Sequence, residues 1–369
     1  MPDTLSDRLE PYAQIARTLG VDAVALVPGP NFARVVPHPF SSHERPFLIV
    51  VPAEAAPAAL VPNLELGSWN AIGFEGAVFD WRDQDGYVAA FDALLSHLSI
   101  ASVAVEGQVM RVFVHHALLE AQPDLRIVDA EAEISGLRTV KTAGELDALR
   151  AAIDVSERAL ARTLESIRAG QSEAEIERAL VSNLFAEGAE ALAFGPIVAA
   201  GDNSARPHAK ARADYVISPG DALLFDFGAR VRGFAADITR TVFLGHASDE
   251  AREVYDTVLR ANRRGFEVTR AGITAHEIDD AVTGVLEASP FADRIRTKTG
   301  HGLGREVHEA PYIMRGNPAA LDAGTVFTNE PGLYAPGRFG VRIEDDVLVT
   351  EDGCVSLTQF PKELTVLPC

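Results

Sequence analysis

Residues 221–245 read DALLFDFGARVRGFAADITRTVFLG, and this stretch decides how the second part of the chain folds. Two apolar runs flank the segment Ala229–Gly233, whose composition is typical of a turn between two strands. A turn centred near residues 231–232 would place Asp226 opposite Asp237, with Cβ atoms about 4.5–5.5 Å apart. Two such carboxylates among apolar neighbours would repel each other and would be costly to desolvate, so we expect a cation between them.

A second acidic hairpin is predicted nearer the C-terminus, in VFTNEPGLYAPGRFGVRIEDDVLV (326–349). A turn of Pro, Gly and Arg at 336–338 would place Glu330 opposite Glu344. Either hairpin alone is explained as well by an exposed acidic pair or by an ion pair with a neighbouring arginine, Arg240 or Arg342. The repeated placement of facing carboxylates favours a cation site instead.

Two histidines lie between the hairpins, in TKTGHGLGREVHEAPYI (297–313). We expect His301 in a glycine-rich turn, where the backbone can approach closely and hold the ring. His308 follows at the end of a short extended run. A lone histidine is usually structural, but two beside four carboxylates indicate a metal ligand and a helper.

Four carboxylates and one imidazole form an oxygen-rich donor set. Such a set suits manganese, cobalt or zinc better than copper or an iron–sulfur centre. Two ions about 3.5–4 Å apart can activate water as a nucleophile and polarise a carbonyl group. The residues therefore predict a hydrolase with two divalent ions, for which we favour manganese or cobalt and keep zinc as an option.

The motifs DFG…DITRT, GHGLGREVHEAP, NEPG and VRIED resemble, in this order, those of the pita-bread metallopeptidases. That family comprises Xaa-Pro aminopeptidase, Xaa-Pro dipeptidase (prolidase) and methionine aminopeptidase. The preceding domain resembles the creatinase-type N-terminal domain, which methionine aminopeptidases typically lack. The resemblance implies an α+β protein in which a pita-bread catalytic domain (138–369) follows a smaller α/β creatinase-type domain (1–137).

The resemblance also implies a metal-binding role for each matching donor. It assigns Asp226 to one metal ion, and His301 and Glu330 to the second. Asp237 and Glu344 would bridge both ions.

Further positions are expected to contact the substrate. His308 would hydrogen-bond the scissile carbonyl or the tetrahedral intermediate, and His208 in GDNSARPH would line the pocket. Arg342 would support the bridging carboxylates beside the substrate. Glu330 would carry a proton to the leaving nitrogen, which makes it catalytic as well as a ligand. Prolidases often have an arginine just after HE-x-P, but here that position is Tyr312, which we expect to contact the substrate.

A metal-dependent mechanism suits an Xaa-Pro bond, because that bond has no N–H for a peptidase to bind. We favour an Xaa-Pro dipeptidase acting on short peptides and keep Xaa-Pro aminopeptidase as the alternative. A dipeptidase must bind a free carboxylate, and the arginines that could replace the missing one are Arg45, Arg315 and Arg338. A non-catalytic or metal-free creatinase-like relative is a remote alternative, since all five ligand positions hold suitable donors.

The composition limits partners and compartment. A net charge of −20 argues against nucleic acid and anionic membranes, which would repel the chain. Two cysteines without metal spacing fit a reducing compartment. With no secretory signal and no apolar run long enough to span a bilayer, we expect a cytoplasmic protein. Residues 1–137 hold no catalytic constellation, so we expect them to limit substrate length, through a homodimer.

Periodicity and capping signals predict the main elements. A helix is expected at 4–19, ending at Gly20, and the chain from 134 to 145 reads as a linker followed by a helix start. Capping boxes of a Ser or Thr followed three residues later by Glu predict helix starts at Thr142, Ser172 and Thr274. Strands are expected at 24–27, 47–51, 102–105, 194–199, 222–228, 234–243, 325–330 and 341–349.

Overall fold

The computed structural model describes residues 4–36 and 38–369. The chain divides into two compact units, Met1–Arg138 and Thr139–Cys369, and each is described by itself. No helix within the described ranges combines the length and apolar character needed to cross a bilayer.

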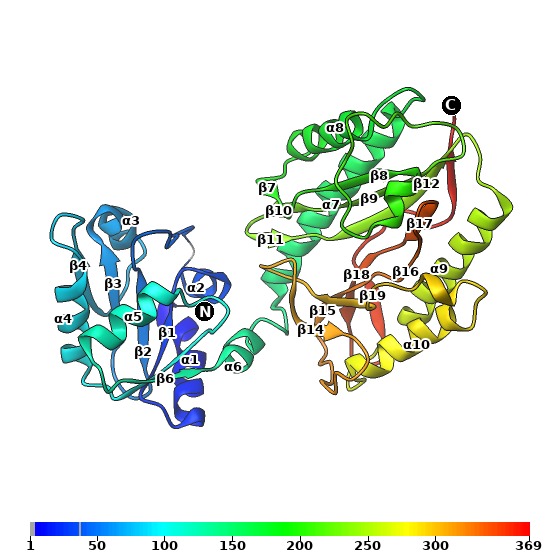
Figure 1. Ribbon diagram of the computed structural model, residues 1–369. Helices are drawn as coiled ribbons and strands as arrows, with labels where there is room; N and C mark the ends of the chain where they lie inside the picture. Colours follow the sequence, from blue (N-terminus) through cyan, green and yellow to red (C-terminus); the bar gives the residue numbers. More distant parts are fainter. Residues whose placement is uncertain (1–3, 37) are drawn as a thin grey trace. The chain divides into compact units, whose positions relative to one another are not determined.

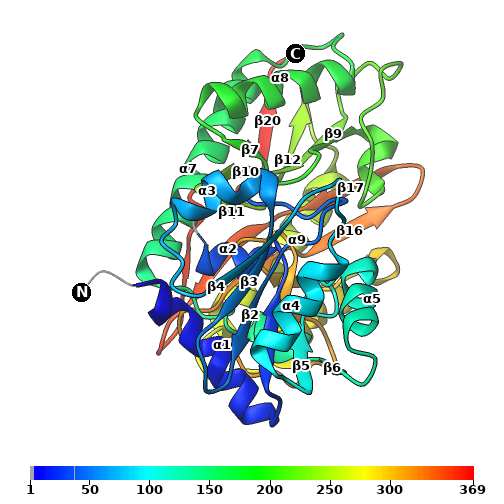
Figure 2. The same ribbon diagram turned by 90° about the vertical axis from the view of Figure 1, so that its left-hand side faces the viewer.

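The first unit is built on a mixed six-stranded sheet (Figures 1 and 2). Its strand order is β4-β3-β2-β1-β5-β6, with parallel pairs at β1–β5, β5–β6 and β3–β4. The strands are β1 (Ala23–Leu26), β2 (Leu48–Pro52), β3 (Ala58–Pro62), β4 (Ala77–Trp81), β5 (Ser102–Val105) and β6 (Arg126–Asp129).

Helices cover both faces of this sheet because successive residues of its central strand point to opposite sides. Val24 and Leu26 pack with side chains of α1, α2 and α6, whereas Ala23 and Ala25 pack with α4 and α5. The helices are α1 (Leu5–Leu19), α2 (Pro30–Val35), α3 (Leu66–Asn70), α4 (Val88–Leu98), α5 (Val112–Ala121) and α6 (Glu131–Gly136).

Sequence signals identified part of this unit. The helix expected at 4–19 is confirmed as α1, and Gly20 ends it with a left-handed φ of 63°. The strands β3, β4 and β6 were not predicted. The prediction of a linker from residue 134 is wrong in its first part, because α6 runs to Gly136.

The second unit places its helices in two pairs around the strands (Figure 1). The pair α7 and α8 packs on one hydrophobic cluster and the pair α9 and α10 on another. The predicted capping boxes are confirmed, since Thr142, Ser172 and Thr274 each accept a bond from the backbone N–H three residues on. These helices are α7 (Ala143–Ser166), α8 (Glu173–Ala186), α9 (Asp249–Val268) and α10 (Ala275–Glu287).

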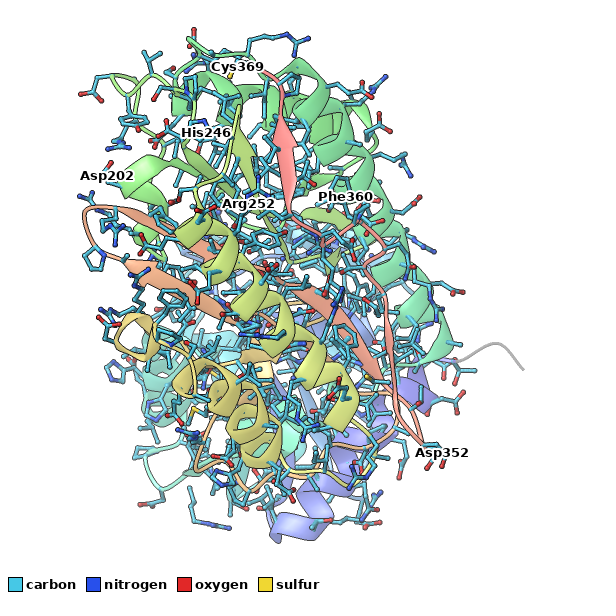
Figure 3. The ribbon with its side chains drawn as sticks, turned by 90° about the vertical axis from the view of Figure 1, so that its right-hand side faces the viewer. Asp202, His246, Arg252, Asp352, Phe360 and Cys369 are labelled. Atoms are coloured by element: carbon cyan, nitrogen blue, oxygen red, sulfur yellow. The ribbon has the colours of Figure 1, made fainter. Side chains whose placement is uncertain are left out.

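The strands of this unit form small sheets of order β11-β10-β7, β20-β12-β9-β8, β14-β13-β15-β18-β19 and β16-β17. The last strand, β20, pairs with β12, so Cys369 lies beside Gly245 and near His246 (Figure 3). The strands are β7 (Ala191–Leu192), β8 (Ile197–Ala200), β9 (Ala222–Phe227), β10 (Ala229–Val231), β11 (Phe234–Ala235), β12 (Ile238–Leu244), β13 (Gly300–Gly302), β14 (Glu309–Ile313), β15 (Val326–Asn329), β16 (Gly332–Ala335), β17 (Phe339–Arg342), β18 (Asp345–Val349), β19 (Cys354–Ser356) and β20 (Thr365–Leu367).

Candidate metal centre

The first acidic hairpin forms, but its register differs from the prediction. Asp226 in β9 pairs with Thr239 in β12, not with Asp237. The turn is made by Arg232 and Gly233, with φ of 51° and 77°, so it is centred one residue later than expected. Moving the turn by one residue shifts the register by two, which keeps both aspartates on one face as diagonal neighbours.

The second hairpin has the predicted register. Gly332 pairs with Arg342 in one ladder, and Asn329 pairs with Asp345 in the next. Both pairs follow the same alignment, which puts Glu330 opposite Glu344 in the gap between the two ladders. The acids therefore stand where the regular pairing is interrupted, and their side chains can converge on a common point.

His301 lies in strand β13, so the prediction of a glycine-rich turn is wrong. Its glycine neighbours are needed for close packing, because a Cβ on Gly300 would lie 1.7 Å from the carbonyl oxygen of Thr328. The ring Nδ1 lies 3.1 Å from the carbonyl oxygen of Gly302. This contact suits an N–H on Nδ1 and directs Nε2 toward the acids, an orientation typical of metal-ligating histidines.

The predicted ligands come together at one point. His301 Nε2 lies 3.3 Å from Glu330 Oε1 and 3.6 Å from Asp237 Oδ2. Donor atoms lie within 4.8 Å of one another in each of three overlapping groups: Asp226, Asp237 and Glu344; His301, Glu330 and Glu344; and Asp237, His301 and His308. The first two groups contain all five predicted ligands and share Glu344, while the third adds His308.

Burial makes this cluster unfavourable in its charged form. It raises the pKa of Glu330 to about 7, and it raises the pKa of Asp226 above its ordinary value. Burial, with repulsion from the neighbouring carboxylates, raises the pKa values of Asp237 and Glu344 well above their ordinary range. Burial also lowers the pKa of His301 to about 3, so its ring is neutral and can act as a ligand.

Arg342 is the guanidinium that contacts these acids. Its Nη2 pairs with Asp226, and its Nη1 donates to the Tyr334 hydroxyl at 2.8 Å. Its side chain is 4% exposed. Of the two alternatives to a cation site, the ion pair with Arg342 does form, at Asp226. The other alternative, an exposed acidic pair, is wrong because the acids are largely buried. Arg240 pairs instead with Asp345, at 2.7 Å.

The remaining predicted residues lie at the open side of the cluster. The exposed His308 ring stacks edge-on with His301, with centroids 4.1 Å apart. His308 is the last residue of the loop before β14, so the prediction that it ends a short extended run is wrong. The exposed His208 is close enough to act on the pKa values of Asp226 and His308. Tyr312 is 38% exposed and pairs with His301 across β13 and β14.

Two polar residues beside the cluster were missed by sequence reasoning. The buried hydroxyl of Thr239 donates to Glu344 Oε2 at 2.6 Å, a contact that the correct register would have indicated. Lys298 holds its ammonium 5.6 Å from the centre of the Tyr312 ring. The sequence feature that could have pointed to Lys298 is its position, three residues before His301 in a chain with a large excess of acids.

The arginines considered for binding a substrate carboxylate are already paired within their own units. Arg45 binds both oxygens of Asp83, at 2.9 and 2.8 Å. Arg315 binds Glu287 and Asp280, and Arg338 binds Glu250.

Comparison with known proteins settles the family. Residues 147–351, more than half of the chain, match Metallopeptidase family M24, and residues 8–140 match the Creatinase/Prolidase N-terminal domain. The chain belongs to metallopeptidase family M24. The predicted resemblance and fold class are thus confirmed: a creatinase-type domain precedes a pita-bread domain.

Individual M24 relatives match over nearly the whole chain. The probable dipeptidase PepE of Mycobacterium tuberculosis is 34% identical over 365 residues, which cover 98% of this chain and 96% of the relative. The crystal structure of dipeptidase PepE from Mycobacterium ulcerans has a TM-score of 0.92 and 33% identity, covering 99% and 98% of the two chains. The X-Pro aminopeptidase from Thermotoga maritima has a TM-score of 0.84 and 32% identity, covering 96% and 99%.

Proposed function

We propose that this M24 peptidase uses two divalent metal ions to hydrolyse Xaa-Pro bonds in short peptides, with dipeptides as its preferred substrates. The convergence of four carboxylates and one imidazole within overlapping 4.8 Å groups carries this proposal. The dipeptidase names of the mycobacterial relatives support the preference for dipeptides. The X-Pro aminopeptidase relative supports proline specificity and supplies the alternative of an aminopeptidase.

The donor set fits two ions. Asp226 would hold one ion, His301 and Glu330 would hold the other, and Asp237 and Glu344 would bridge them. The membership of Glu344 in two donor groups supports its bridging role, and the distance of 3.6 Å between Asp237 and His301 supports that of Asp237. When bound, the ions would activate water as a nucleophile and polarise the scissile carbonyl, with manganese or cobalt favoured over zinc.

The side chains around the donors would orient the substrate and move protons. His308, exposed beside His301, would donate a hydrogen bond to the scissile carbonyl oxygen, and His208 would line the pocket. Glu330 would pass a proton to the leaving nitrogen of proline. Arg342 has its donors on Asp226, Thr239 and Tyr334, so it would position the carboxylates and not contact the substrate.

The test combines metal removal with matched substrates. Exhaustive chelation should abolish cleavage of an Xaa-Pro dipeptide, and manganese or cobalt should restore it. Activity that survives chelation unchanged would exclude a metal-dependent mechanism. Faster cleavage of Xaa-Pro-Yaa tripeptides than of Xaa-Pro dipeptides would favour the aminopeptidase.

We also propose that the protein acts as a cytoplasmic homodimer. The net charge of −20 and the two free cysteines support the compartment. The first unit supplies none of the proposed site residues, which supports a role in limiting access. Light scattering of the purified protein would measure the mass, and a monomeric mass would contradict the dimer.

A further inference from the structure

Lys298 lies at the edge of the candidate metal centre. It comes two residues before β13, and its side chain is exposed. Its ammonium lies 5.6 Å from the centroid of the Tyr312 ring, which belongs to the residue paired with His301. The strand pairing thus brings one lysine, one tyrosine and one predicted metal ligand together at the open side of the cluster.

The charge of Lys298 reaches the reacting groups. It acts on the electrostatics of His301, Glu330 and His308, and after burial it is the next cause that lowers the pKa of His308. No ion pair of Lys298 occurs within the described part of the chain, so its donors remain available to a ligand.

The other cations considered for this role have partners. Arg342 is buried and bonded to Asp226. Arg315 and Arg338 pair with acidic side chains of the same unit, Glu287 and Glu250. Within the described part of the chain, Lys298 differs from these arginines: it lies beside Tyr312, its side chain is exposed, and its N–H donors have no acidic partner.

The chemistry of a dipeptide restricts where a carboxylate-binding cation can stand. In an Xaa-Pro dipeptide, the carboxylate carbon is only two bonds from the nitrogen of the scissile bond. A group that binds this carboxylate must therefore lie within a few ångströms of the group that contacts the scissile carbonyl. Lys298 is in this neighbourhood: it lies over the ring of Tyr312, which pairs with His301, and the His301 ring contacts that of His308.

We propose that Lys298, held over the Tyr312 ring, binds the C-terminal carboxylate of the dipeptide substrate. This inference rests on the proposed Xaa-Pro dipeptidase activity. The aromatic face stabilises the ammonium by a cation–π contact while leaving N–H donors free for the carboxylate. Tyr312 stands just after HE-x-P, so Lys298 from the adjacent segment supplies the positive charge there and the Tyr312 ring holds it in place.

The test compares a dipeptide acid with its neutral amide, Xaa-Pro against Xaa-Pro-NH2, in the manganese-loaded enzyme. Lys298→Met should raise KM for the acid by about 10- to 100-fold, since hydrogen bonds to charged groups are among the stronger ones. Its kcat for the acid, and both constants for the amide, should stay within about threefold of the wild type, because the metal donors are unchanged. Lys298→Arg keeps the charge and should restore most of the affinity.

A neighbouring cation provides the matched control. The exposed Arg296 donates to the backbone carbonyls of Asp293 and Ile295, and Arg296→Met removes the same charge from the same segment. This variant should leave KM for the dipeptide acid unchanged. The product proline should inhibit the Lys298→Met enzyme more weakly than the wild type, whereas prolinamide should inhibit both equally.

The outcomes separate this inference from the proposed function. Equal effects of Lys298→Met on the acid and the amide, or no effect on either, would overturn the assignment while leaving the peptidase activity intact. An equal effect of Arg296→Met would also overturn it. A metal-loaded wild type that cleaves no Xaa-Pro substrate would refute the proposed function, and the role of Lys298 with it.

Discussion

Thr239 connects the two acidic hairpins through its hydroxyl group. The hydroxyl donates to Glu344 at 2.6 Å and accepts from Arg342 Nε at 3.0 Å. Arg342 also pairs with Asp226, so a guanidinium, a hydroxyl and two carboxylates form one buried network. In such a network each group is oriented by its neighbours, so a change at one member is expected to affect the others.

Asp237 should be indispensable among the donors, since its proposed place is between both ions. Asp237→Ala should lower metal affinity by more than about 100-fold, the upper end for residues that only orient ligands. Turnover should fall below detection. Metal content by mass spectrometry and a dipeptide assay measure the two effects. Asp256→Ala, a surface acid on α9, is the control and should change neither quantity; a metal-replete, active Asp237→Ala would contradict the assignment.

His308 should affect the chemistry more than metal binding. His308→Ala should retain its metal and lose about 10²- to 10⁴-fold in kcat, as expected for a positioned hydrogen-bond donor. His246→Ala, at an exposed turn of the same unit (Figure 3), is the control. His308 also belongs to a group of possible metal donors with Asp237 and His301, so the metal content decides whether it is a ligand or a hydrogen-bond donor. Loss of metal in His308→Ala would identify the residue as a ligand.

Residue types and motifs predicted most of this cluster, but not its hydrogen bonds. The five proposed donors could be chosen because acids and histidines among apolar residues are costly without a cation. Thr239, Tyr334 and Lys298 were not chosen, since a threonine, a tyrosine or a lysine has many ordinary roles and gives only a weak signal. Their contacts arise only when the two hairpins and β13 are packed together.

The two hairpins differ in how well their turns could be located. The turn at 336–338 contains both proline and glycine, and the register it predicts is the observed one. The turn at Arg232 and Gly233 requires a positive φ at both positions, for which Arg232 gives no signal. The predicted register was therefore two residues off, yet the face of the strand was correct because side chains alternate with a period of two.

Gly300 provides a test of how β13 positions its histidine. Gly300→Ala would place a Cβ 1.7 Å from the backbone oxygen of Thr328, so β13 must move away from β15. We expect a loss of about 1–3 kcal/mol in the free energy of unfolding, as for overpacked cores. Metal content should fall with it, because His301 shifts away from the acids. Denaturant unfolding and metal analysis measure the two effects.

The control for Gly300 is a glycine with open space around it. A Cβ added at Gly284 in α10 would meet nothing within 4 Å, and alanine suits a helix better than glycine. Gly284→Ala should leave metal binding unchanged and should not reduce stability. A Gly300→Ala protein as stable and as metal-rich as this control would show that close strand contact is not required.

At the scale of the whole chain, each unit has hydrophobic clusters of its own. The α/β character of the first unit was predictable from its longer helices and apolar runs. Its strands β3, β4 and β6 were not, because each contains residues that are uncommon in strands: two alanines and a proline in β3, an alanine and an aspartate in β4, and an aspartate in β6. The second unit was predicted better, since capping boxes mark the starts of three of its helices and acidic residues mark its two hairpins.

Metal binding should therefore stabilise the chain unevenly. All five proposed donors lie in residues 139–369, and ligand at 100 times its dissociation constant stabilises a folded state by about 2.7 kcal/mol. Amides of β9, β12, β15 and β18 that exchange through opening of this unit should exchange up to about 100-fold more slowly with manganese than after chelation. Amides of β1 and β2 should change little, because the first unit supplies no donor. Hydrogen exchange read by mass spectrometry, with magnesium as the control ion, would measure both units in one sample. Equal protection of both units, or none in the hairpins, would contradict a metal site built within residues 139–369.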